Sequence, residues 1–161
     1  MKVTLKRLTI MGCVLVIGFG VYLITFSYYD AVTPLKTAQS LLDMVQATSD
    51  SQQIVTDLKT IKTLIPKDGN PVWVFPTDST DFVLIQKDLD HMLLTVDKVS
   101  NVSSDSEEFR SAMEVMHLEA SIMYQNLLDA MPFTYVNLSF VFANLMCIVG
   151  SMGLAEIFTR K

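Results

Sequence analysis

The segment Ala130–Ala155, AMPFTYVNLSFVFANLMCIVGSMGLA, decides the fold. It runs for 26 residues between Asp129 and Glu156 without a charged side chain. A helix that crosses the hydrocarbon core of a bilayer, about 30 Å thick, needs roughly 20 apolar residues, because its backbone groups find no water there. The segment therefore predicts a transmembrane helix, and residues 156–161 predict only a short tail on its far side.

A second apolar segment lies near the N-terminus. Leu8–Tyr29 contains no charged residue and follows the short basic stretch 1–7. Two interpretations are open, a cleaved signal peptide and an uncleaved membrane anchor. The segment is longer than the roughly 7–15 apolar residues of a signal-peptide core, and it ends in the bulky Tyr28 and Tyr29. We therefore expect an anchor whose tyrosines lie at the level of the lipid headgroups.

Charge divides the chain into two basic tails and an acidic middle. Residues 1–7 and 156–161 together carry a net charge of +4, whereas residues 30–129 hold sixteen acidic and seven basic residues, a net charge of −9. The positive-inside rule predicts that both termini are cytoplasmic and that residues 30–129 lie outside. We expect a cell-membrane protein that crosses the lipid bilayer twice. The acidic middle disfavours nucleic acid as a partner.

Four apolar stripes with helical spacing follow one another in the outer segment. The first two lie within Leu35–Val45 and Ile54–Ile65. In the third and fourth, apolar residues recur alternately every three and every four residues, as in a coiled-coil seam. These two seams are Phe82, Ile85, Leu89, Met92, Val96 and Val99, and then Phe109, Met113, Met116, Ala120, Met123 and Leu127. The pattern predicts an all-α fold in which transmembrane helices 8–29 and 130–155 flank an extracytoplasmic up-down-up-down four-helix bundle, residues 30–129.

Capping residues suggest where these helices begin. We expect the second helix to start at Ser49–Ser51, the third at Thr77–Thr80, and the fourth at a capping box formed by Ser104 and Glu107. Pro34 either starts a new helix or kinks one continuous helix. We expect the fourth helix to run into the last span through Met131 and Pro132.

The connection between the second and third helices contains the only tryptophan of the chain. Here Val72-Trp73-Val74-Phe75 lies between two prolines. As a plug over the open end of the bundle the segment would bury Trp73 and Phe75, and as an exposed tip it would bind a partner. We expect the plug. In a later connection, Asn101-Val102-Ser103 is a candidate glycosylation site.

Candidate metal ligands are few. His91 and His117 each neighbour a methionine, and the fourth helix also carries Met113 and Met116. Imidazole and thioether groups suit copper. Methionine at a seam position is, however, an ordinary filler of a helical core. We therefore expect no metal, no other cofactor and no enzymatic activity.

The last apolar segment also carries small side chains at regular spacing. Ser139, Ala143, Cys147, Ser151 and Ala155 recur every fourth residue, and Asn137 and Asn144 lie nearby. Small residues allow close approach of a second helix, and an amide that faces lipid is costly. We expect this face to be a helix-packing interface with the first span or with other transmembrane subunits.

The paired spans, the acidic helical middle and the Met116-His117 pair resemble the small accessory subunits of archaeal ammonia monooxygenase, a copper membrane enzyme. The resemblance implies a non-catalytic accessory or structural subunit of a larger membrane protein complex, whose catalytic metals belong to larger subunits. The layout is also similar to the two-span sensor modules of chemoreceptors, although those continue into a long cytoplasmic signalling part and this chain ends at Lys161. The alternative is therefore a small sensor or ligand-binding membrane module that signals to a separate cytoplasmic partner.

Overall fold

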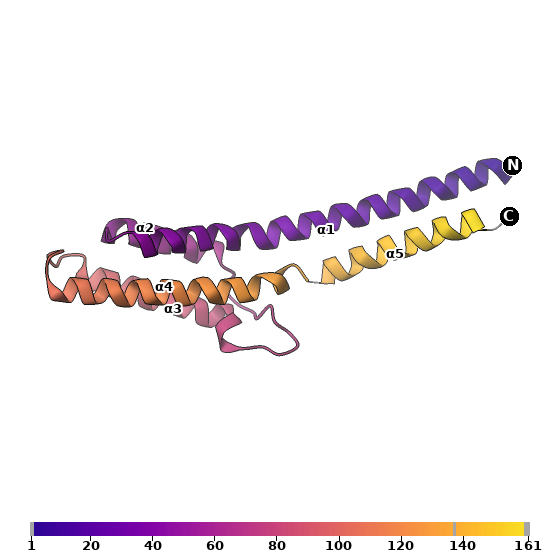
Figure 1. Ribbon diagram of the computed structural model, residues 1–161. Helices are drawn as coiled ribbons and strands as arrows, with labels where there is room; N and C mark the ends of the chain where they lie inside the picture. The colour runs from indigo at the N-terminus through magenta and orange to yellow at the C-terminus, as the bar shows by residue number, and fades with distance from the viewer. Residues whose placement is uncertain (1, 137, 160–161) are drawn as a thin grey trace. The chain divides into compact units, whose positions relative to one another are not determined.

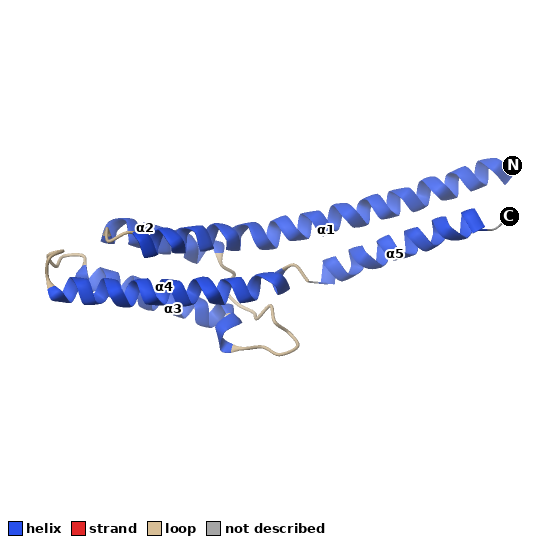
Figure 2. Ribbon diagram, in the orientation of Figure 1, coloured by secondary structure: helices blue, strands red, loops and turns tan. Residues whose placement is uncertain are grey.

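The structure, a computed structural model, describes residues 2–136 and 138–159 (Figure 1). The described residues contain no strand, which confirms the predicted all-α class (Figure 2). The elements are α1 (Lys2–Ala47), α2 (Ser51–Leu64), the short 3₁₀ helix η1 (Asp78–Thr80), α3 (Phe82–Val99), α4 (Glu107–Thr134) and α5 (Leu138–Thr159).

The chain divides into two compact units. One consists of Val32–Thr134 and is called the polar unit here. The other consists of Met1–Ala31 with Tyr135–Lys161 and is called the apolar unit. The polar unit begins and ends within a few residues of the predicted outer segment 30–129.

One hydrophobic core holds the polar unit together. The C-terminal part of α1 and helices α2, α3 and α4 all contribute to it, and each buries the apolar stripe that its sequence shows. Spacings that alternate between three and four residues keep side chains on one helix face, which explains why whole stripes are buried together. The fully buried large side chains include Leu35, Leu42, Ile54, Leu58, Ile61, Ile85, Leu89, Met92, Met116 and Leu127.

Side-chain caps fix where α2 and α3 begin. The carboxylate of Asp50 accepts a hydrogen bond from the backbone N–H of Gln52 at 2.9 Å, within the predicted start of the second helix. Asp81 caps α3 by accepting from the N–H of Val83 at 2.8 Å. The predicted start of the third helix at Thr77–Thr80 is therefore wrong, because η1 occupies most of that stretch and the helix begins after it.

Helix α4 is capped by a different serine from the one that the sequence suggested. The hydroxyl of Ser106 accepts a hydrogen bond from the N–H of Phe109 at 3.1 Å. Glu107 is already the first helical residue. In a capping box, an acidic residue lies three positions after the capping residue. Because Ser106 is the capping residue, that position is Phe109, and the predicted box of Ser104 and Glu107 is wrong.

Helices α1 and α4 each contain a proline, Pro34 and Pro132, and only α1 continues far beyond its proline. Helix α1 continues through Pro34, so the interpretation with one continuous helix holds. Helix α4 passes Pro132 but ends at Thr134, whose hydroxyl donates to the carbonyl oxygen of Met131 at 2.8 Å. The expectation that the fourth helix runs into the last span is wrong. A proline removes one N–H donor and crowds the preceding turn, which favours a helix end nearby.

Helix α5 is the last apolar helix of the chain. It spans Leu138–Thr159, so it starts and ends later than the predicted helix 130–155. The predicted helix had included the last turn of α4 and the connection after it. That connection contains Asn137, which lies outside the described residues.

Within the apolar unit, α1 and α5 approach each other at glycine positions. A Cβ atom at Gly20 would lie 2.8 Å from the carbonyl oxygen of Ala143 and 2.6 Å from the Sγ atom of Cys147. A Cβ atom at Gly150 would lie 2.6 Å from the side chain of Ile17. Separations this short exclude a side chain, so glycine is what permits the close packing of the pair.

Among the described residues, two helical stretches are long and apolar enough to cross a membrane, one within Lys6–Ala47 and the other within Glu107–Thr159. Only 6% of the most apolar part of the first stretch and 11% of that of the second are buried. The core helix of a globular protein would be mostly buried. These apolar surfaces instead face outward.

Candidate functional sites

The most exposed apolar feature of the polar unit is the segment Val72–Phe75, called the apolar tip here. Trp73 is 70% exposed and Phe75 is 81% exposed. The predicted plug is therefore wrong. Ile65 and Phe82, which flank the connection that carries the tip, are themselves buried in the core. The core therefore buries apolar residues on both sides of this connection and leaves the tip outside it.

Asn70 fixes the two ends of the connection that carries the tip. Its side-chain amide donates to the carbonyl oxygen of Thr77 at 2.9 Å. Its side-chain oxygen accepts from the N–H of Val72 at 3.0 Å and from the hydroxyl of the buried Thr80 at 2.9 Å. A surface loop whose ends are held together in this way presents its outer residues in a defined position. The sequence pattern did not identify this role of Asn70.

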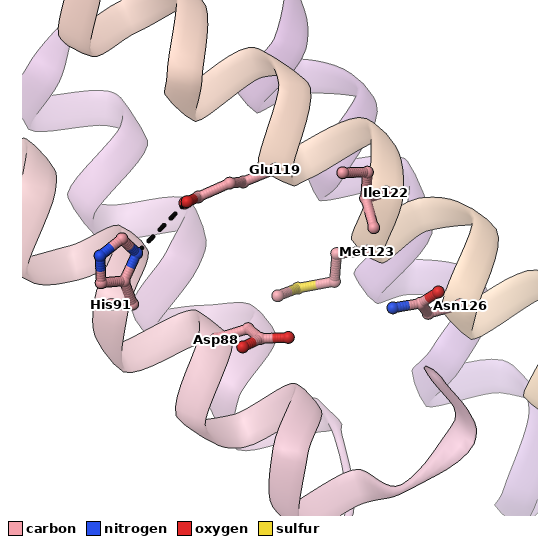
Figure 3. A pocket seen from close by; sticks show the side chains of 6 residues that line it. All are labelled: Asp88, His91, Glu119, Ile122, Met123 and Asn126. Carbon is pink, nitrogen blue, oxygen red and sulfur yellow. Dashed lines mark ion pairs between the residues drawn. The ribbon is translucent and has the colours of Figure 1, made fainter. Parts of the chain in front are cut away.

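A cavity of about 190 Å³ lies between α3 and α4 (Figure 3). The Nδ1 atom of His91 lies 3.3 Å from the Oε1 atom of Glu119 across the two helices. The Oε2 atom of Glu119 is buried and has no hydrogen-bond partner among the described residues. The cavity is lined by Asp88, His91, Glu119, Ile122, Met123 and Asn126. Its polar groups are the carboxylates of Asp88 and Glu119, the imidazole of His91 and the amide of Asn126. Such a set of polar groups is able to hold a small ligand.

Sequence reasoning identified only His91 among the polar residues of this cavity. Asp88 lies three positions before His91, and Asn126 lies seven positions after Glu119. Both spacings place the members of a pair on the same helix face. This spacing is a signal that could have found the set, but only the pairing of α3 with α4 shows that the two faces meet.

The other candidate metal ligands have structural roles. Met113 and Met116 are buried in the core, where the seam pattern placed them. The Nε2 atom of His117 lies 3.0 Å from the carbonyl oxygen of Thr48 and so joins α4 to the end of α1. Among the described residues, no three or more His, Cys, Asp or Glu side chains form a group that could hold a metal ion.

The row of small residues on α5 is divided between two faces. Ala143 is fully buried, and Cys147 is half-buried against Gly20 of α1. In contrast, Ser139, Ser151 and Ala155 are exposed. A step of four residues turns about 40° beyond one full helical turn, so a row with this spacing drifts around the helix. Only the middle of the row can face one neighbouring helix.

Of the two asparagines near this row, the structure describes Asn144 only. The side-chain amide of Asn144 donates to the carbonyl oxygen of Phe140 on its own helix at 2.8 Å. This bond satisfies one donor without a second helix. Asn137 lies outside the described residues.

The candidate glycosylation residue lies in a different connection of the polar unit. Asn101 is exposed in the turn between α3 and α4. An exposed turn is accessible to modification, so the position agrees with the requirement for an acceptor asparagine. Glycosylation of Asn101 stays a prediction.

Fold and sites together define an all-helical protein with a compact polar unit and two helices that are long and apolar enough to cross a membrane. Comparison of the chain with protein-family models, with curated proteins and with solved structures finds no match.

Proposed function

We propose that the protein is a non-catalytic accessory subunit of a larger membrane protein complex. In this proposal, α5 and the N-terminal part of α1 cross the cell membrane and both termini are cytoplasmic. The polar unit is an up-down-up-down four-helix bundle outside the membrane. The resemblance noted in the sequence suggests a copper membrane monooxygenase of the ammonia monooxygenase kind as the complex.

The outward-facing side chains of the apolar unit support the membrane part of this proposal. Large apolar residues at many positions of this unit are more than half exposed, among them Leu8, Leu15, Phe19, Tyr22, Leu145, Ile148 and Met152. A patch of this extent on a protein in water would be a strong driving force for association. Lipid is the environment in which such a surface carries no penalty.

The observation that carries the accessory-subunit proposal is the partial use of the small-residue row on α5. Helix α1 occupies the part of the row at Ala143 and Cys147. Ser151 and Ala155 remain exposed on the same helix. This remaining part offers a neighbouring helix the same close approach that α1 uses, and a further transmembrane subunit would fill it.

Leucine at Ser151 and Ala155 tests the proposal. We expect the Ser151→Leu/Ala155→Leu variant to insert into the membrane normally, because leucine is as apolar as lipid, and to lose the larger subunits that co-purify with the unmodified chain in mild detergent. A matched control is Gly18→Leu, since a Cβ atom at Gly18 has no neighbour within 4 Å. The measurement is the ratio of each co-purified subunit to the chain by quantitative mass spectrometry.

Two results would contradict the proposal. One is an unmodified chain that purifies without membrane partners in a constant ratio. The other is a Ser151→Leu/Ala155→Leu variant that keeps its partners in the same ratio as the control. Either result would mean that the exposed part of the row faces lipid.

A second candidate function is a small sensor or ligand-binding membrane module, and the cavity between α3 and α4 favours it. Glu119 lines this cavity, and its buried Oε2 atom has no hydrogen-bond partner among the described residues. A sensor would respond to a small ligand through this group and would lose the response in a Glu119→Gln variant. An accessory subunit would keep its partners in that variant.

A further inference from the structure

We propose that the apolar tip is a membrane-interface anchor. Trp73 and Phe75 would enter the headgroup region of the bilayer leaflet on the side of the polar unit. The inference rests on the part of the proposed function in which α1 and α5 cross the membrane. It does not depend on any partner subunit.

The pairing of α1 with α4 shows that the first and last residues of the polar unit lie at the same end of it. Thr48 lies beside His117, and Gln39 donates to the carbonyl oxygen of Tyr124 at 3.4 Å. The two helices are therefore antiparallel. Continued in the same register, this pairing places Val32, the first residue of the polar unit, near the last turns of α4.

The tip lies at this same end of the polar unit (Figure 1). The side-chain amide of Gln86, in the first turns of α3, donates to the carbonyl oxygen of Ile65 at 3.0 Å. Because α3 and α4 are joined by a short connection, the start of α3 lies beside the end of α4. The short helix η1, which follows the tip, packs against α4. The tip therefore projects from the end at which the polar unit is joined to both apolar helices.

In the proposed topology, the chain leaves and re-enters the membrane through this end of the polar unit. Val32 lies four residues after Tyr28, and Thr134 directly precedes Tyr135. The rings of these two tyrosines lie 5.5 Å apart within the apolar unit. Tyrosine and tryptophan are enriched at the headgroup level of membranes, so the tyrosine pair marks the expected level of the interface.

The composition of the tip suits insertion among lipid headgroups. No charged residue lies between Gly69 and Thr77, so insertion would desolvate no charge. The flanking Pro71 and Pro76 have no N–H group, and the N–H of Val72 already donates to Asn70. Few backbone donors would lose water, which is the main cost of moving an irregular segment out of water. Exposed Trp and Phe on such a segment are typical of interfacial anchors.

The single tryptophan makes the inference directly measurable. Emission of the full-length chain, reconstituted in lipid vesicles that contain no other protein and excited selectively at tryptophan, reports Trp73 alone. We expect a loss of emission with lipids brominated close to the headgroup, a smaller loss with lipids brominated near the chain end, and little quenching by iodide in the water. The matched control is the Trp73→Phe/Asn101→Trp variant, whose tryptophan lies at the opposite end of the polar unit. Its emission should be quenched by iodide and unaffected by brominated lipids.

Retention of the chain in membranes washed with alkaline carbonate separates the two claims. If the chain is extracted, the proposed membrane crossing fails and the anchor fails with it. If the chain is retained but iodide quenches Trp73 and neither brominated lipid does, only the anchor is overturned. Protection of Trp73 from iodide that requires the other subunits of a native complex would also overturn it, because the tip would then bind protein.

Discussion

Replacing Leu89 with alanine is expected to lower the free energy of unfolding of the polar unit by about 2–5 kcal/mol. Leu89 is fully buried in the middle of the α3 seam, so truncation leaves a cavity among side chains from neighbouring helices. Thermal unfolding followed by circular dichroism in detergent measures the loss.

Leu94 supplies a control with the same chemical change on the same helix. It is 61% exposed. Leu94→Ala should change the free energy of unfolding by no more than about ±0.5 kcal/mol. Equal destabilisation by the two substitutions would show that the seam on α3 does not pack into the core as described.

The second large effect is expected in the apolar unit, where Gly20→Ala should weaken the pairing of α1 with α5. The new methyl group would lie 2.8 Å from the carbonyl oxygen of Ala143, a backbone atom that cannot rotate away. Overpacking of this kind costs about 1–3 kcal/mol. Reversible unfolding titrations in mixed micelles with increasing SDS measure the change.

Gly18→Ala is the matched control for this substitution. A Cβ atom at Gly18 has no neighbour within 4 Å, so the same added methyl group meets no obstacle. Its titration midpoint should equal that of the unmodified chain or exceed it slightly, because alanine favours a helix more than glycine does. A lower midpoint for Gly18→Ala than for Gly20→Ala would contradict the observed packing of the pair.

The parts of the fold that sequence predicted well depend on long periodic patterns. The seam residues from Phe82 to Val99 repeat over several helical turns, and each of the six is buried. Over that length, only one helix face fits the pattern. Helix starts depend instead on one side chain. Several serines, threonines and aspartates near each start are able to cap, and the pattern did not single out Ser106 or Asp81.

The candidate sites were harder to predict because burial of a short segment depends on the rest of the fold. Four apolar residues in Val72–Phe75 fit a buried plug or an exposed tip, and the sequence favoured the plug. The structure buries Ile65 and Phe82, on either side of this connection, and leaves Trp73 and Phe75 exposed. The small-residue row on α5 shows a different limit, since a four-residue spacing looks regular in sequence but changes face along a helix.

The most direct test of the central claim is a cysteine-accessibility measurement in intact cells. Cysteine is placed at Asn101 or at Lys161 in a chain whose native Cys13 and Cys147 are replaced by alanine, and a membrane-impermeant thiol reagent is added outside. If the protein crosses the membrane twice and its polar unit lies outside, the cysteine at position 101 is labelled in intact cells. The cysteine at position 161 is then labelled only after the cells are opened. Labelling at Lys161 from outside, with Asn101 protected until the cells are opened, would contradict it.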